Sequence, residues 1–268
     1  MKKRVPTAIV LLGLFFLLLQ YGSRTLMFVV LQAVILAALF EFYALAAKKG
    51  LHPQSYLGAV LSVLLGLSFF RPDVLPLGLA VFAVIFFTGV FSLFTFTRAE
   101  HLPYLTQSIA VTFFGVFYLS FTLNHIFLLW SERGPYFIYF LSAVITLGDT
   151  GAYFIGVLAG RHKMAPLASP NKTWEGCAGG ILFAVLGAWA AWALLLKDEV
   201  GLPLALVTAA VVHAVAQASD PLESLFKRAV GVKDSSNILP GHGGFLDRFD
   251  SFILAGPFFY YLIRYFWK

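Results

Sequence analysis

Residues 74–96 read VLPLGLAVFAVIFFTGVFSLFTF, a run of 23 positions with no charged side chain. A transmembrane α-helix needs roughly 20 mostly apolar residues to cross the hydrocarbon core of a bilayer. The run is apolar on all sides, whereas a strand of a membrane barrel would alternate apolar and polar positions. This stretch therefore predicts a membrane-spanning helix.

The rest of the chain has the same character. Of its 268 residues, 60% are hydrophobic and 12% are charged, and the mean hydropathy is +0.85. A soluble domain of this length would need more polar side chains to cover its surface. The single cysteine, Cys177, excludes a disulfide framework within the chain. Because no internal repeat or low-complexity linker occurs, residues 1–268 are expected to form one membrane domain.

Long apolar runs separated by short charged patches predict an all-α integral membrane protein, a polytopic helical bundle with about nine transmembrane helices. The first run follows a basic start, but no small-x-small cleavage site comes after Leu19, so we expect an uncleaved first helix. The expected spans are residues 5–21, 25–46, 55–70, 74–96, 104–129, 136–159, 176–196, 202–219 and 251–267.

The distribution of Lys and Arg predicts the orientation of the bundle, because cytoplasmic loops carry an excess of basic residues. With the N-terminus in the cytoplasm, thirteen basic residues fall on inner segments and six on outer ones. The net charge of +6 has the same explanation. Since the basic residues form no continuous stripe with stacking aromatics, no nucleic-acid partner is expected.

Residues 220–250 form the longest polar connection and hold nine of the 32 charged residues. A plain solvated loop is the alternative to a functional site, since basic inner loops are common. The residues run Ser224-x-Phe226-Lys227-Arg228, Lys233-Asp234, Ser236, Leu239-Pro240, His242-Gly243-Gly244-Phe245 and Asp247-Arg248-Phe249-Asp250. This order resembles the signature of the phosphatidate cytidylyltransferases, or CDP-diacylglycerol synthases, of the bacterial type. A pattern of about a dozen fixed positions over 27 residues is very specific.

A second polar cluster supports the resemblance. The runs Gly148-Asp149-Thr150-Gly151-Ala152 and Ser169-Pro170-Asn171-Lys172-Thr173-Trp174-Glu175 look like two further segments of the same family. Both clusters fall on the inner side in a topology that comes from charge counting alone. With this resemblance, residues 1–130 are expected to be mainly scaffold helices, and residues 136–268 to hold the catalytic helices and cytoplasmic loops.

The resemblance implies a nucleotidyltransferase of phospholipid biosynthesis that joins CTP and phosphatidic acid into CDP-diacylglycerol and pyrophosphate. It also implies a homodimer, Mg²⁺ with room for a second ion of unknown identity, and a site on the cytoplasmic face of the inner membrane. The attacking group is the lipid phosphate, so no protein nucleophile is needed. The protein must bring two anions together, which calls for a divalent metal held by carboxylates and for Lys and Arg around the phosphates.

Four aspartates are the candidate metal ligands. We expect Asp220, at the end of the eighth span, and Asp247, at the start of the ninth, as first ligands, with Asp250 and Asp149 as further members. Asp247 and Asp250 are three residues apart and share a helix face. The alternative for this pair is a favourable placement of negative charge at a helix N-terminus. Asp149 lies well inside an apolar run, where an ionisable side chain is a functional candidate.

The basic residues of both clusters are candidates for phosphate contacts, with anchoring to acidic lipid head groups as the alternative. The glycines of the His-Gly-Gly turn would let backbone amides approach phosphate, while His242 would contact nucleotide or brace the turn. Thr173 has helix capping as its alternative role. The expected catalytic residues are Asp220, Asp247, Asp250, Lys227 and Arg228, and the expected substrate-binding residues are Asn171, Lys172, Thr173, Ser224, Lys233, Asp234, His242, Gly243, Gly244 and Arg248.

His213, Gln217 and Asp220 are spaced i, i+4 and i+7 and form one polar stripe on the eighth span. Such a stripe faces the bundle interior or a wet cavity, and for His213 and Gln217 interhelical hydrogen bonding is an equal alternative. Gly148 and Gly151, which flank Asp149, indicate close helix contact or a local break. Glu41 lies near the inner end of its span, and no role is assigned to it.

Three other functions are alternatives. A transporter would also place polar residues within its spans, but this chain has no inverted repeat and its charge is concentrated at one face. The second alternative is an enzyme that uses CTP on a different lipid, such as a polyprenol kinase, a group that resembles this family distantly. The Asp-Gly-x-x-Ala-Arg run of the CDP-alcohol phosphatidyltransferases does not occur, and neither does the GxxxxGK[ST] loop of P-loop NTPases.

Overall fold

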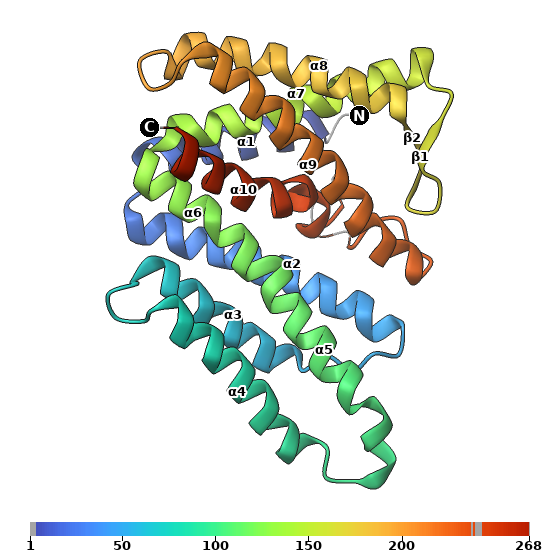
Figure 1. The fold of residues 1–268 in the computed structure, drawn as a ribbon. Coiled ribbons are helices and arrows are strands. Elements are labelled where there is room, and N and C mark those ends of the chain that lie inside the picture. Colours follow the sequence, from blue (N-terminus) through green and yellow to red (C-terminus); the bar gives the residue numbers. More distant parts are fainter. Residues whose placement is uncertain (1–3, 237, 239–242, 268) are drawn as a thin grey trace. The chain divides into compact units, whose positions relative to one another are not determined.

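The fold was described from a computed structural model of the chain (Figure 1), which describes residues 4–236, 238 and 243–267, and side chains from Leu12 onward. Helices account for nearly all of the regular structure. The elements are α1 (Arg4–Tyr21), α2 (Arg24–Lys48), α3 (Ser55–Phe70), α4 (Leu77–Thr95), η1 (Ala99–Tyr104), α5 (Leu105–Gly115), η2 (Val116–Phe121), α6 (Thr122–Arg133), α7 (Pro135–Ala159), β1 (Lys163–Ala165), β2 (Ser169–Thr173), α8 (Trp174–Ala191), η3 (Trp192–Leu196), α9 (Leu202–Ala229) and α10 (Leu246–Phe266).

Each predicted span coincides with a helical segment, and η1, α5, η2 and α6 run on as one segment, Ala99–Arg133. Six segments within the described part of the chain are long and apolar enough to cross a membrane. Ser55–Phe70 is apolar but shorter, and α10 is not among the six. The protein is thus a multi-pass helical membrane protein, and nine crossings stays a prediction.

The chain divides into two compact units. The first contains Met1–Phe127 and Ala229–Arg248, and the second contains Leu128–Arg228 and Phe249–Lys268. The chain passes between them within α6, α9 and α10. Each unit therefore combines segments that are far apart in the sequence.

The first unit has an apolar interior with a few paired polar groups. Phe28 of α2 stacks on Phe70 of α3, with ring centroids 4.6 Å apart. The Nε2 of Gln32 donates to Oδ1 of Asn124 at 2.7 Å, and the Tyr43 hydroxyl donates to the carbonyl of Thr112 at 2.7 Å. Between membrane helices such bonds satisfy polar groups that lipid cannot, and they fix which helix faces meet.

In the second unit α7 and α8 lie side by side (Figure 1), and glycines permit the close approach. A Cβ on Gly176 of α8 would lie 2.8 Å from the carbonyl oxygen of Ala152 on α7. A Cβ on Gly151 would collide with the ring of Phe183. Small residues let membrane helices pack backbone to backbone. The glycines beside Asp149 therefore mark helix contact, and α7 continues through them without a break.

A small antiparallel hairpin, β1–β2, joins α7 to α8, which the all-helical prediction did not include. Lys163 pairs with Thr173, and Ala165 with Ser169. The second strand leads directly into α8, where the Thr173 side chain accepts a hydrogen bond from the amide of Gly176 at 3.1 Å. Thr173 is thus the N-cap of α8, which confirms the capping alternative for this residue.

Candidate active site

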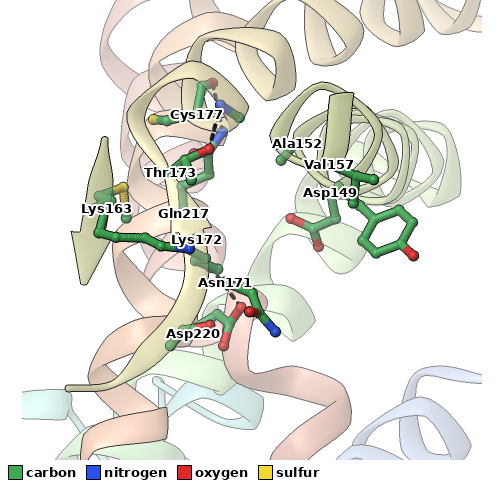
Figure 2. Close-up of a pocket in the computed structure, with 15 residues that line it drawn as sticks. Asp149, Ala152, Val157, Lys163, Asn171, Lys172, Thr173, Cys177, Gln217 and Asp220 are labelled. Carbon is green, nitrogen blue, oxygen red and sulfur yellow. Dashed lines mark hydrogen bonds and ion pairs between the residues drawn. The ribbon is translucent and has the colours of Figure 1, made fainter. Parts of the chain in front are cut away.

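A pocket of about 640 Å³ opens in the second unit between α7, the hairpin, the start of α8, and α9 (Figure 2). This volume lies within the range of roughly 300–1,000 Å³ that is typical of small-molecule sites. Its walls come from three segments that are separate in the sequence, namely α7, the hairpin with the start of α8, and α9. The lining residues are Asp149, Ala152, Tyr153, Gly156, Val157, Lys163, Met164, Ser169, Asn171, Lys172, Thr173, Gly176, Cys177, Gln217 and Asp220.

Asp149 supplies the acidic group of the α7 wall. Figure 2 shows its carboxylate facing across the pocket toward Lys172 and Asn171 of the hairpin. The charges of Lys172 and Asp220 both act on Asp149. An acidic side chain on an apolar helix is tolerated where it faces a polar cavity, so the pocket explains the position of Asp149 in the sequence.

The opposite wall is held by an ion pair between the hairpin and α9. The Lys172 Nζ lies 2.7 Å from Oδ2 of Asp220, and their side chains are 26% and 31% exposed. The Ser224 hydroxyl, one turn further along α9, donates to Oδ1 of Asp220 at 3.3 Å. Both oxygens of Asp220 thus have partners, and Ser224 lies against this aspartate within α9.

Glu175 fixes the base of the hairpin. Its Oε2 accepts the amides of Arg161 and His162 at 3.0 and 3.1 Å, and its Oε1 lies 2.5 Å from Nδ1 of His162. The amide of Trp174 also donates to the carbonyl of His162 at 2.9 Å. These bonds close the hairpin at its open end, so they set where Lys163, Asn171 and Lys172 enter the pocket.

The polar stripe of α9 has different roles along its length. Gln217 lines the pocket, and its Nε2 donates to the carbonyl of Cys177 on α8 at 3.1 Å. His213 is fully buried, and a Cβ on either Gly148 or Gly180 would strike its ring. Interhelical hydrogen bonding, the structural alternative for the stripe, is therefore confirmed for Gln217, while His213 packs between α7 and α8.

Lys227, a predicted catalytic residue, forms a buried ion pair with Glu223, which lies one helical turn earlier on α9. Its Nζ lies 2.5 Å from Oε2 of Glu223, and the two side chains are 8% and 0% exposed. The sequence interpretation did not single out Glu223, although an acidic residue four positions before a lysine is the spacing of a helical ion pair. The neighbouring Arg228 is exposed.

The start of α10 is tied to α9 in the second unit. The Ser219 hydroxyl donates to the backbone carbonyl of Asp250, and the Asp250 carboxylate accepts the amide of Ser251 at 2.6 Å. The charges of Asp220, Lys227 and Asp149 all act on Asp250. Three of the four predicted metal ligands, Asp149, Asp220 and Asp250, are thus electrostatic neighbours.

Asp247 belongs to the first unit, where it organises the segment that precedes α10. Its Oδ2 accepts the amide of Ser235 at 2.9 Å, the Ser235 hydroxyl at 2.8 Å and the amide of Gly244 at 2.8 Å. The Gly244 amide, which the sequence suggested for phosphate, thus donates to Asp247. Gly243 has a φ of +78°, a conformation that favours glycine.

The other predicted residues of this segment are exposed or lie outside the described residues. Lys233, Asp234 and Arg248 are exposed at the surface. His242, Leu239 and Pro240 lie outside the described residues.

The sequence interpretation also missed Lys163, and it assigned no role to Glu41. Lys163 lines the pocket from β1, and Figure 2 shows it across the pocket from Asp149. Glu41 of α2 is a buried carboxylate that accepts hydrogen bonds from the segment before α10. The signal for Glu41 was present, since an acidic residue within a membrane span is a functional candidate.

The fold and the pocket together describe a polytopic membrane protein whose pocket is lined by two aspartates and two lysines. The cytidylyltransferase family matches residues 2–266. The chain belongs to this family, as one of its phosphatidate cytidylyltransferases.

Curated relatives agree over nearly the full length. The phosphatidate cytidylyltransferase of Bacillus subtilis is 32% identical over 273 residues, covering 99% of this chain and 98% of that protein. That of Staphylococcus haemolyticus is 33% identical, covering 96% of each. That of Staphylococcus saprophyticus is 44% identical over 126 residues, which is 47% of this chain and 48% of that protein.

Proposed function

We propose that this enzyme makes CDP-diacylglycerol and pyrophosphate from CTP and phosphatidic acid, and that the pocket between α7, the hairpin and α9 takes the triphosphate. The observation that carries the proposal is the arrangement of two lysines, Lys163 and Lys172, around a pocket that also holds Asp149 and Asp220. Full-length relatives carry the corresponding name.

The reaction needs positioning rather than a protein nucleophile. A phosphate monoester carries a charge of about −1.5 to −2 at neutral pH, so the lipid phosphate is already a nucleophile. Its oxygen attacks the α-phosphorus of CTP, a new P–O bond forms, and the bond from the α-phosphorus to the bridging oxygen breaks. The electron pair leaves with pyrophosphate. The enzyme lowers the barrier by holding two anions in line and by stabilising the leaving group.

The residues present are compatible with Mg²⁺. Among residues 4–236, 238 and 243–267, no three His, Cys, Asp or Glu side chains lie close enough to hold a metal by themselves. Mg²⁺, however, is usually bound by one or two carboxylates together with water and substrate phosphates. Asp149 and Asp220 line the pocket and would hold it. Asp250 and Asp247 are further candidates on the signature of the sequence alone. When bound, the ion supplies charge neutralisation at the phosphates.

The lysines do the remaining electrostatic work. Lys172 lies beside Asp220 at the wall of the pocket, where it would contact a phosphate of the bound nucleotide. Lys163 extends the same positive wall along β1. Lys227, Arg228, Lys233 and Arg248 are the candidates for the lipid phosphate and the departing pyrophosphate, because Lys and Arg provide strong charge-assisted hydrogen bonds.

The excess of basic residues on one side supports a pocket that faces the cytoplasm of a bacterial inner membrane. This location suits a reaction between a membrane lipid and a water-soluble nucleotide. The resemblance of the signature supports a homodimer.

The test uses purified full-length protein in detergent with phosphatidic acid, labelled CTP and Mg²⁺, followed by extraction of labelled lipid. We expect a cytidine-labelled lipid from the wild type, its loss when EDTA is added, and its loss in Asp220→Asn. A folded wild type that forms no labelled lipid with any divalent metal would defeat the proposal. Flux of a solute without nucleotide turnover, measured in proteoliposomes, would favour a transporter instead.

A further inference from the structure

Glu41 lies on α2, almost 200 residues before the signature segment, yet its carboxylate binds that segment at four points. The side chain is 5% exposed. Oε1 accepts the Ser236 hydroxyl at 2.6 Å and the Phe245 amide at 3.1 Å. Oε2 accepts the Ser235 hydroxyl at 2.9 Å and the Leu246 amide at 2.8 Å.

Two of these donors are amides at the N-terminus of α10. The first amides of a helix have no partner within the helix, so they need an acceptor from elsewhere. A negative charge at this end is also favourable because of the helix dipole. Glu41 therefore caps α10 from another helix, and the buried carboxylate is stabilised there by the hydrogen bonds that it accepts.

The same contacts reach Asp247. The Ser235 hydroxyl lies 2.9 Å from Oε2 of Glu41 and 2.8 Å from Oδ2 of Asp247, and a hydroxyl has a single hydrogen to donate. The two carboxylates thus share one serine. A Cβ on Gly244 would lie 2.6 Å from Cδ of Glu41 and would also strike the Ser235 hydroxyl. Gly244 therefore has to be a glycine, because a side chain at this position would collide with the Glu41 carboxylate.

We propose that Glu41 is a positioning residue, which sets the first turn of α10 and, through Ser235, the orientation of Asp247. This role rests on the proposed function, in which the first turn of α10 supplies Asp247. Glu41 itself touches neither substrate in this proposal. Its effect on turnover passes through the segment that it holds.

The test compares Glu41→Gln with Gln32→Leu in the full-length protein. Gln keeps the size of Glu41 but leaves one oxygen for four donors and places an NH₂ group against them. Gln32 is a matched control, because it lies on the same helix, is also 5% exposed, and bonds Asn124 instead of the signature segment. Both variants lose a buried polar contact of α2, so a general loss of stability would affect both.

Two readouts are needed, kcat per folded molecule and amide hydrogen exchange of the peptide containing Phe245 and Leu246. We expect Glu41→Gln to lower kcat by about 100-fold, the effect typical of a small misplacement of a reacting group, with the KM for CTP within about threefold of wild type. Exchange at residues 245 and 246 should become faster in Glu41→Gln and stay unchanged in Gln32→Leu.

The inference is overturned if Glu41→Gln keeps the wild-type kcat, or if both variants lose activity in proportion to their folded fraction with no selective change in exchange. A wild type that makes no labelled lipid would count against the proposed function. The exchange comparison would still decide whether Glu41 holds the start of α10, so the two failures can be told apart.

Discussion

The ammonium group of Lys172 lies 2.7 Å from the carboxylate of Asp220, so the hairpin is joined to the polar end of α9 by an ion pair within the pocket. Both side chains are partly exposed, and solvent screening keeps such a pair weak. It can therefore open at little cost when a ligand offers each partner a stronger interaction. In the proposed function, this pair is the arrangement of Lys172 and Asp220 before substrate binds.

Replacing Asp220 by Asn should test this arrangement. We expect kcat to fall by at least about 100-fold, comparable to the loss of one group that stabilises a transition state. The thermal midpoint should change little, because the ion pair is weak. Asp198→Asn is the control, since Asp198 is an exposed aspartate of the segment between η3 and α9. Equal activity of the two variants would remove Asp220 from the site.

Lys163 should contribute to nucleotide affinity. Lys163→Gln is expected to raise the KM for CTP by about tenfold, which corresponds to about 1.4 kcal/mol of binding free energy. The effect should shrink at high ionic strength, because salt screens an exposed charge. Lys197→Gln, which alters an exposed lysine remote in sequence from the pocket, should leave KM unchanged. A KM for Lys163→Gln that matches this control would place the triphosphate elsewhere.

The buried pair Glu223–Lys227 separates stability from function. Glu223→Gln removes the carboxylate of the pair with Lys227, and breaking a buried pair costs about 3–5 kcal/mol. We expect a clear fall in the thermal midpoint in detergent. The double variant Glu223→Leu, Lys227→Met should recover stability, since apolar replacements of both partners are often tolerated. We expect this double variant to be inactive because it lacks Lys227. An active double variant would exclude Lys227 from catalysis.

Glu175 should control the hairpin. Glu175→Ala removes the acceptor of the Arg161 and His162 amides, so trypsin should cut faster after Arg161 and Lys163. We expect the KM for CTP to rise, while kcat at saturating CTP changes less, because the pocket residues themselves remain. Glu199→Ala is the control, as Glu199 is exposed. Unchanged proteolysis would show that other contacts hold the hairpin closed.

Gly244→Ala should be harmful for a steric reason. The added methyl would collide with Glu41 and Ser235, and overpacking of this kind costs about 1–3 kcal/mol. We expect lower activity and faster exchange at the start of α10. In contrast, Gly89→Ala should be tolerated, because no atom beyond its chain neighbours and its own helix backbone lies within 4 Å of a Cβ at that position. Full activity of Gly244→Ala would mean that the turn can move without consequence.

The sequence predicted the helices well because each one is a long apolar run, and burial in lipid makes such runs easy to recognise. The ends were less certain. α9 was expected to end near Ser219 but continues to Ala229, since Leu222, Leu225 and Phe226 keep a helical apolar spacing beyond Asp220. The hairpin was missed because its residues are polar and its strands are short, and Glu175 stabilises it through contacts that no local pattern shows.

The candidate site was predicted in part. Asp149, Asn171, Lys172, Thr173 and Asp220 do line one pocket, as the two polar clusters suggested. The contacts of Asp247 with Ser235 and Gly244 could not be read from composition, because they depend on the path of a turn. The bond from Glu41 to Leu246 spans 205 positions, and a single sequence carries no record of such a pairing.

The hydrogen bonds of Glu41 have a consequence for how fragments of this protein should be understood. A piece that begins after α2 would contain every residue of the signature and would still lack the carboxylate that caps α10. A match to the signature is therefore not enough to show that a fragment is active. Co-expressing the two halves as separate chains is a stricter test. We expect activity to return only when the half that contains α2 is present, because the signature segment depends on Glu41.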